Sequence, residues 1–316
     1  MRVIDFHCDT PSRIYDPRRK RKLANMGTPE RTAGLSPYVQ LSASFCPVSC
    51  ENEEGFALIC EMLECWQSAA AEGRAYPPLK TAAELKKALE KGQQVSVLTL
   101  EDARPLNGEL SRVDLLFERG VRLITPLWRD DTVIGGAWNS SEGLTPFGEA
   151  AAERFLELGG ILDVSHASRA SHAQIVALCR RYGRAPVATH SNAFALTNHN
   201  RNLTDEQIRE IGLLGGVIGL NFYPNFLTLG DESVTMRELA LHLRHVMDLG
   251  GESVCVLGSD FDGVDALPEG ISSAADLPRF AEYLQKNGFS ADFIDRFFFE
   301  NGKNYLMKNL PQGTDV

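Results

Sequence analysis

The stretch Val3–Asp9, which reads VIDFHCD, combines the pattern of a buried strand with a polar end. Valine, isoleucine and phenylalanine favour strands, and an extended chain sends His7 and Asp9 to the same side because side chains alternate. An imidazole and a carboxylate placed in this way can bind one cation together. A hydrogen-bonded structural histidine beside a loop-capping aspartate explains the same two residues equally well. The stretch therefore predicts an opening strand whose end carries two candidate metal ligands.

Short apolar runs of this kind recur along the whole chain and alternate with segments of helical period. Including the first, we predict strands over Val3–Cys8, Leu41–Cys46, Val95–Leu100, Val121–Leu127, Gly160–Ser165, Ala185–Thr189, Gly216–Phe222 and Val254–Ser259. We predict helices over Glu53–Glu72, Thr81–Glu90, Phe147–Leu158, Ala170–Tyr182, Thr204–Leu213, Thr235–Leu249 and Ser290–Met307. Eight strand–helix alternations predict an α/β fold, a (β/α)8 barrel of the TIM type. We expect residues 1–316 to form a single domain, with residues 308–316 as a frayed tail.

The composition argues against nucleic acids and membranes as binding partners. With 43% hydrophobic and 23% charged residues the chain resembles an average folded protein. Its net charge of −10 opposes binding to nucleic acid and to anionic membranes, and we find no apolar run near the ~20 residues that span a bilayer. The seven cysteines show no metal-binding spacing, and we expect no secretory leader, because the sequence enters the first predicted strand at Val3. We therefore expect reduced thiols and a cytoplasmic location.

Three more polar residues stand at the ends of predicted strands: Glu101, His166 and His190. In a parallel barrel these ends meet at one mouth, where active sites lie. Each histidine taken singly is explained as well by a core residue bonded to a carbonyl group. Their coincidence at strand ends, together with His7 and Asp9, predicts a pair of divalent ions that share Glu101. Nitrogen and carboxylate ligands of this kind favour zinc.

Other residues at the same mouth are candidates for catalysis and substrate binding. Asp260 follows the last strand, and we expect it to act as general base and acid, although a loop-capping aspartate is the alternative. Arg201 can grip a substrate carboxylate with two hydrogen bonds, but an exposed loop arginine is usually only solvated. Tyr223 follows the seventh strand, where lining the pocket and packing on a loop are equally compatible.

Five segments in this order carry a resemblance to a known family: Asp5–Pro11, Gly143–Gly148, Leu162–His166, His190-Ser191 with Arg201-Asn202, and Ser259–Gly263. Through nearly its whole length the chain resembles the membrane (renal-type) dipeptidases, a zinc-dependent branch of the amidohydrolase-like barrels. The resemblance implies that His7 and Asp9 hold one zinc ion, that Glu101 bridges, and that His166 and His190 hold the other. It also implies that Arg201 meets the C-terminal carboxylate of a dipeptide, that Asp260 handles the proton, and that the chain forms a homodimer.

Two segments depart from that family's pattern. The family commonly has a glycine-rich segment after the bridging glutamate, where this chain has Glu101–Pro105. Trp128 stands near the position of a family histidine that is thought to polarise the scissile carbonyl. One such donor contributes several kcal/mol to a transition state, so the means of carbonyl activation is open, and a metal ion is an alternative source.

We therefore predict a metal-dependent dipeptidase in which a hydroxide that bridges two metal ions attacks the peptide bond. One alternative is hydrolysis of another amide or ester, such as an N-acyl amino acid or a lactone, at the same centre. Replacement of Arg201 separates these two, because only carboxylate substrates depend on it. A second alternative is a non-catalytic binding barrel, which metal analysis of the purified protein tests.

Overall fold

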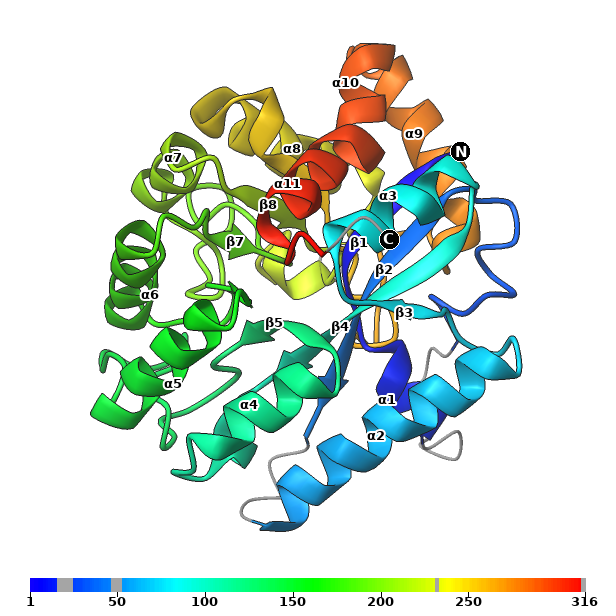
Figure 1. The fold of residues 1–316 in the computed structure, drawn as a ribbon. Helices are drawn as coiled ribbons and strands as arrows, with labels where there is room; N and C mark the ends of the chain where they lie inside the picture. The colour runs from blue at the N-terminus through cyan, green and yellow to red at the C-terminus, as the bar shows by residue number, and fades with distance from the viewer. Residues whose placement is uncertain (16–24, 47–52, 231–232, 314–316) are drawn as a thin grey trace.

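Eight parallel strands form the ring at the centre of the molecule (Figure 1). The computed structural model describes residues 1–15, 25–46, 53–230 and 233–313. Neighbouring strands are bonded in the order β6-β5-β4-β2-β1-β9-β8-β7, and a bridge between Asp163, just after β6, and Val187 in β7 joins the two ends of this row. The strands are β1 (Val3–Cys8), β2 (Tyr38–Phe45), β4 (Gln94–Glu101), β5 (Val121–Thr125), β6 (Ile161–Leu162), β7 (Val187–Ala188), β8 (Val217–Leu220) and β9 (Cys255–Leu257). The predicted α/β barrel is confirmed, and the additional strand β3 (Pro78–Leu79) pairs with β4 outside the ring.

All eight predicted strands are present, but their lengths differ from the prediction. β1 has the predicted bounds, whereas β6 and β7 keep only two residues each. The carboxylate of Asp163 explains the shortening, since its Oδ1 accepts the backbone N–H groups of Ser165 (2.8 Å) and Thr189 (2.9 Å). A side chain thus takes over donors that a longer strand would use in its ladder.

Helices connect successive strands and cover the outside of the ring (Figure 1). The α-helices are α1 (Thr10–Tyr15), α2 (Glu53–Ala71), α3 (Ala82–Glu90), α4 (Ser111–Glu118), α5 (Pro146–Glu157), α6 (Arg169–Arg181), α7 (Asp205–Leu213), α8 (Met236–Gly250), α9 (Leu277–Lys286), α10 (Ala291–Asp295) and α11 (Asn301–Asn309). Short 3₁₀ turns lie at Arg104–Leu106, Pro224–Phe226, Glu252–Val254 and Ala274–Asp276. The predicted final helix is divided, because the π-helical segment Arg296–Glu300 separates α10 from α11. The prediction missed α1, α4 and α9.

The helix starts follow the local sequence. Thr204 and Gln207 form a reciprocal capping box at α7, as their spacing predicts. Thr145 accepts the N–H of Gly148, and Pro146 occupies the first position of α5. These caps satisfy N–H groups that have no partner inside the helix.

The expectation of a frayed tail over residues 308–316 is wrong for its first six residues. Residues 308 and 309 complete α11, and Leu310 is buried. The carbonyl groups of Pro311 and Gln312 accept the N–H groups of Ala82 and Ala83 in the first turn of α3. The tail is ordered because it supplies acceptors that this helix start needs; residues 314–316 lie outside the described part.

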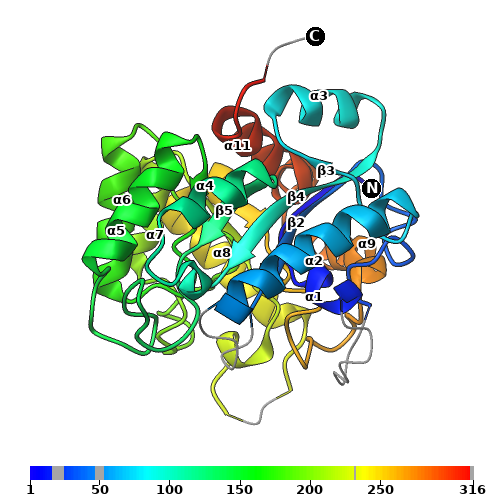
Figure 2. The same ribbon diagram turned by 60° about the horizontal axis from the view of Figure 1, so that its bottom comes forward.

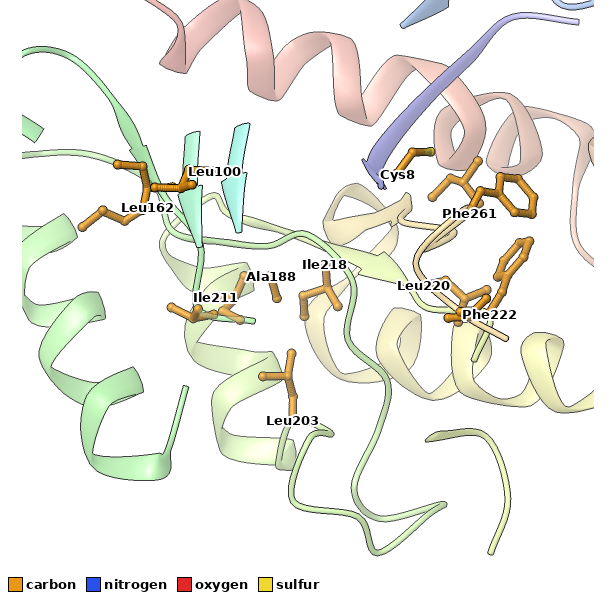
Figure 3. Packing of buried hydrophobic residues seen from close by; sticks show 14 of the residues in the cluster. Cys8, Leu100, Leu162, Ala188, Leu203, Ile211, Ile218, Leu220, Phe222 and Phe261 are labelled. Carbon is orange, nitrogen blue, oxygen red and sulfur yellow. The ribbon is translucent and has the colours of Figure 1, made fainter. Parts of the chain in front are cut away.

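Buried apolar side chains fill the space between the ring and the helices. Figure 3 shows Phe222, after β8, and Phe261, after β9, which meet edge to face at 5.8 Å between ring centres. Phe280 of α9 packs on Phe222 in the same way at 5.6 Å. Aromatic pairs in this geometry contribute beyond the area they bury, so they anchor the segments that leave β8 and β9.

The two ends of the barrel have different coverings. Tyr305 of α11 donates its hydroxyl to the carbonyl of Ala185, and the α11–C-terminal segment lies at one end of the molecule in Figure 2. The segment that follows β8 lies at the opposite end (Figure 2). Chemistry is therefore expected at the end away from α11, where the strands finish.

Two expectations from composition can be compared with the described residues. Among the described cysteines, free thiols are found at Cys8, Cys60, Cys65, Cys179 and Cys255. None of the described helices has the length and apolar character needed to cross a membrane.

Candidate metal centre

The structure brings the five predicted metal ligands together at the ends of four strands. His7 lies within β1 with Asp9 directly beyond it, and Glu101 is the last residue of β4. His166 and His190 lie a few residues after β6 and β7. All five side chains are buried.

Glu101 occupies the middle of this cluster. Its Oε1 lies 3.0 Å from His166 Nε2 and 3.5 Å from His190 Nε2. Its Oε2 lies 3.5 Å from His7 Nε2, which is also 3.5 Å from Asp9 Oδ2. The two carboxylate oxygens thus face two different groups of donors.

The tautomer of His166 follows from its outer hydrogen bond. Its Nδ1 lies 2.8 Å from the carbonyl oxygen of Trp128, which can only accept. Nδ1 therefore carries the proton, and Nε2 presents a lone pair to the cluster. His166 also has a φ of 65°, in the left-handed region that non-glycine residues seldom adopt.

A hydroxyl and a buried carboxylate orient His190. Its Nδ1 lies 2.7 Å from Thr189 Oγ1, and this hydroxyl donates in turn to Asp163 Oδ2. Thr125 Oγ1 donates to the same carboxylate oxygen at 2.7 Å. Because the hydroxyl of Thr189 already donates to Asp163, it accepts from His190, whose Nε2 is left with a lone pair.

The donor set fits a divalent cation. His166 Nε2 and His190 Nε2 lie 3.0 Å apart, with their lone pairs facing one carboxylate oxygen of Glu101. His7 Nε2 is buried and has no hydrogen-bond partner among the described residues. Acceptors that face one another without a proton between them repel, and a cation removes that repulsion. Two groups with mutual spacing suited to an ion are His7, Glu101 and His190, and His7, Asp9 and Asp260.

Burial and neighbouring charges shift the pKa values of the histidines and of Glu101 in the cluster. Burial lowers the pKa of His7, but the Glu101 and Asp9 carboxylates outweigh it and hold that pKa well above its usual value. Burial raises the pKa of Glu101, but His7, His166 and His190 hold it well below its usual value. Burial brings the pKa of His166 to about 4, and burial with the charge of His7 holds the pKa of His190 well below its usual value. Positive charge is therefore favoured beside Glu101, and a bound cation would displace the proton of His7.

Asp260 lies at the edge of the same cluster. Its backbone N–H donates to the carbonyl of His7 at 3.0 Å, and Asn221 Nδ2 donates to its Oδ2 at 3.0 Å. Burial raises the pKa of Asp260 to about 7, and the Asp9 and Glu101 carboxylates act in the same direction. Gly263 makes this approach possible, since a Cβ there would lie 2.1 Å from Asp9 Oδ2 and 2.2 Å from Asp260 Oδ1.

Arg201 is near the cluster but buried behind its surface. It is 3% exposed, and its Nη1 and Nη2 donate to Ser191 Oγ and to the carbonyl of His190, both at 2.9 Å. Its Nε has no partner among the described residues. Burial lowers the pKa of Arg201 to about 10, so the guanidinium stays charged at neutral pH. It is not among the residues that line the cavity beside the cluster.

A cavity of about 600 Å³ opens directly over Asp9, Glu101, His166 and Asp260. Tyr223 lines it, in agreement with its predicted position, and so does Trp128. Sequence reasoning missed several other lining side chains: Phe45, Arg129, Trp138, Phe226 and Asp265. Phe45 was within reach of prediction, because it stands near the end of a predicted strand. Trp138 and Phe226 lie in long connections, where periodicity carries no signal.

Comparison with known proteins finds a family whose members resemble nearly the whole chain. The model of the family described as membrane dipeptidase, peptidase family M19, matches residues 1–306. An uncharacterized protein encoded in the pqqA 5′ region of Klebsiella pneumoniae is 32% identical over an alignment of 244 residues, and the match covers 73% of this chain and 88% of that protein.

Solved structures with the same fold include two metallopeptidases. The dipeptidase AC, of family M19, has a TM-score of 0.87 at 26% identity, over 98% of this chain and 99% of its own. A metallopeptidase from Rhodobacter sphaeroides, liganded with a phosphinate mimic of the dipeptide L-Ala-D-Ala, has a TM-score of 0.85 at 25% identity with the same coverage.

Proposed function

This chain belongs to the membrane dipeptidase family, peptidase family M19, and is a metal-dependent dipeptidase; we propose that it cleaves dipeptides on two zinc ions held by Glu101 and its neighbours. The observation that carries the proposal is the convergence of three imidazole Nε2 atoms on the two carboxylate oxygens of Glu101.

Two groups of ligands would hold the ions. Glu101 Oε1, His166 and His190 form one group, and Glu101 Oε2, His7 and Asp9 form the other. Imidazole with carboxylate is a ligand set that zinc favours. When bound, the ions supply a water molecule of lowered pKa and polarise the scissile carbonyl, a task that needs no histidine at the position of Trp128.

Asp260 moves the proton in this proposal. Its carboxylate accepts a proton from the attacking water and returns it to the amine that leaves. Burial brings its pKa to about 7, near the pH at which a general base and acid must exchange a proton. Asn221 holds the carboxylate through Oδ2, and Oδ1 lies near Asp9 Oδ2, in the space that a Cβ on Gly263 would fill.

Arg201 is the proposed anchor for the C-terminal carboxylate of the substrate. It is a buried cation next to His190, and its Nε has no partner among the described residues. Arg129 lines the cavity directly and is the competing anchor. Replacing each by methionine separates the two: loss of Arg201 should raise KM for free dipeptides and spare their C-terminal amides, whereas loss of Arg129 should change both alike.

Release of amino acids from a dipeptide panel tests the activity. The panel should pair L-residues with both L- and D-residues at the C-terminal position, because the Rhodobacter sphaeroides relative binds a mimic of L-Ala-D-Ala. We expect turnover that a chelator abolishes and zinc restores, and about two zinc equivalents per chain after purification without chelator. Turnover of no dipeptide would contradict the proposed peptidase, and less than about one equivalent of metal would contradict the centre.

Asp260→Asn tests the proton step within the same assay. Removing a general acid–base group should lower kcat by about 10²–10⁴-fold. Metal content is measured alongside: it should stay near the wild-type value if Asp260 only moves the proton, and a loss of metal would make Asp260 a ligand, since its carboxylate lies within ligand spacing of His7 and Asp9. A variant with wild-type kcat would remove Asp260 from the mechanism.

A further inference from the structure

Aromatic rings form two separate walls of the cavity over the metal cluster. The first, the Phe45–Trp128 pair, has ring centres 4.8 Å apart. The second, the four-ring wall, is continuous: Trp138 lies 5.1 Å from His199, His199 lies 4.8 Å from Phe226, and Phe226 lies 5.0 Å from Tyr223. All six side chains line the cavity.

Both tryptophans are held in place by the same candidate metal ligand. The carbonyl of Trp128 accepts from His166 Nδ1 at 2.8 Å, and the N–H of Trp138 donates to the carbonyl of His166, also at 2.8 Å. The Trp128 and His166 rings lie 6.3 Å apart. The backbone of each tryptophan is thus hydrogen-bonded to His166, which holds the chain segment that carries each indole ring beside the cluster.

The strand order places the Phe45–Trp128 pair and the β8 rings on opposite sides of the mouth. Phe45 ends β2 and Trp128 follows β5, so the pair flanks β4, which carries Glu101. Tyr223 and Phe226 follow β8, which stands four places from β4 in the ring of eight. A dipeptide over the cluster therefore has one residue near each wall.

The position of Arg201 sets the direction of the dipeptide. Arg201 follows β7, next to β8 in the ring, and its guanidinium carbon lies 5.6 Å from the centre of the Phe226 ring. If Arg201 holds the C-terminal carboxylate, the C-terminal residue lies beside the four-ring wall. The N-terminal residue then faces the Phe45–Trp128 pair.

We propose that the Phe45–Trp128 pair is the binding site for the side chain of the N-terminal residue, and that it selects dipeptides whose N-terminal residue is aromatic or large and apolar. This inference rests on the proposed function. Phe45 is almost fully buried and Trp128 is half-buried, so the pair offers the cavity a firm apolar surface. The cavity volume of about 600 Å³ lies within the range of roughly 300–1,000 Å³ for sites that hold drug-sized ligands. Such a space accommodates large side chains, which lose more water-exposed apolar surface than small ones do.

Two dipeptide series measure the selection independently at the two positions. One varies the first residue (Phe-Ala, Leu-Ala, Gly-Ala) and the other varies the second (Ala-Phe, Ala-Leu, Ala-Gly). With the zinc-loaded full chain we expect kcat/KM for Phe-Ala to exceed that for Gly-Ala by about 10-fold or more, the discrimination that an apolar pocket gives. Trp128→Ala should reduce this ratio by about 10-fold and leave the Ala-Phe to Ala-Gly ratio near its wild-type value.

Matched variants test whether the preference at the first position depends on the aromatic ring of Trp128. Trp128→Phe retains an aromatic face and should keep most of the first ratio, and Trp128→His, the residue that the family resemblance suggests there, should lower it. Trp138→Ala lies in the other wall and should change the second ratio instead. Zinc content and melting temperature check that His166 remains in place, since every variant keeps the carbonyl of residue 128.

The outcomes separate this inference from the proposed function. Turnover of none of the six dipeptides, with each chiral second residue supplied as both the L- and the D-isomer, overturns the proposed function, and the inference with it. Turnover without preference at the first position, or a first ratio that Trp128→Ala leaves unchanged, overturns the inference alone. Equal changes of both ratios in Trp128→Ala also overturn it, because a general disturbance of the cluster would act on both positions.

Discussion

The two sides of the barrel mouth position their candidate ligands by different means. On the β1–β4 side, β1 has six residues and β2 and β4 have eight each, and Glu101 lies inside the ladder, paired with Phe45 on one side and Thr125 on the other. On the β6–β7 side each strand has two residues, and His166 and His190 lie beyond them. Backbone ladder bonds place Glu101, whereas hydrogen bonds to buried side chains place the segments that carry His166 and His190.

The β6–β7 side therefore depends more on individual side chains. Asp163 accepts four hydrogen bonds, from Thr125 Oγ1, Ser165 N, Thr189 N and Thr189 Oγ1. A ladder bond survives a change of side chain, whereas a bond from a carboxylate or a hydroxyl does not. Replacing a buried side chain should therefore lower metal affinity more on the β6–β7 side than replacing an equally buried one does on the β1–β4 side.

Glu101→Gln should have the largest effect, because its carboxylate joins the two sides. The β4 ladder is made of backbone groups, so the barrel should still fold, but both proposed ions lose a charged ligand. We expect metal affinity to fall by more than about 100-fold, beyond the 10–100-fold that a residue behind a ligand contributes, and dipeptidase activity to fall to background. Metal titration measures the loss of affinity, and circular dichroism checks that the barrel still folds. Two tightly held ions in the variant would show that Glu101 is not shared.

Thr189→Val tests the side-chain dependence of the β6–β7 side. It removes the hydroxyl between Asp163 and His190 and so frees the imidazole to turn or change tautomer. Metal affinity at the His166–His190 group should fall by about 10–100-fold, as isothermal titration would show.

Ser44→Ala is the matched control on the β1–β4 side. Ser44 is buried in β2, and its hydroxyl has no hydrogen-bond partner among the described residues. Losing it should leave metal affinity near wild type and change the free energy of unfolding by less than about 1 kcal/mol. Equal losses in Thr189→Val and Ser44→Ala would contradict the contrast between the two sides.

His172→Leu should have the smallest effect, on stability alone. His172 lies in α6, after β6, and neither ring nitrogen has a partner among the described residues. Burial, together with the charge of Arg169, lowers the pKa of His172 to about 4. The unfolded chain, with a histidine pKa near 6.5, therefore binds the proton first, and stability is lost as pH falls from about 6.5 to 4.

The substitution should remove that part of the pH dependence. The free energy of unfolding of the wild type should fall more steeply than that of the variant between pH 7 and pH 5, by about 2 kcal/mol. At pH 7 the variant should be more stable by about 1 kcal/mol, because an unpartnered polar group leaves the core. Urea unfolding at both pH values measures this, and parallel curves for the two proteins would refute it.

Much of the candidate site was predictable because its residues stand at strand ends. His7, Asp9, Glu101, His166 and His190 were named from that rule, and the structure brings them together. Their role as ligands stays a prediction. Arg201 illustrates the limit: its place after a strand suggested a residue open to substrate, yet tertiary packing buries it against Ser191 and Phe226.

The sequence by itself determined the order of the strand–helix units and the polar residues that end the strands. Local periodicity encodes each unit, and a parallel ring brings all the carboxyl ends to one mouth whatever the details of packing. Only the tertiary structure decided the length of β6 and β7, the tautomers of His166 and His190, and the two aromatic walls. Those features depend on hydrogen bonds and ring contacts between side chains far apart in the chain, such as Thr125 with Asp163 and Phe45 with Trp128, which no local pattern records.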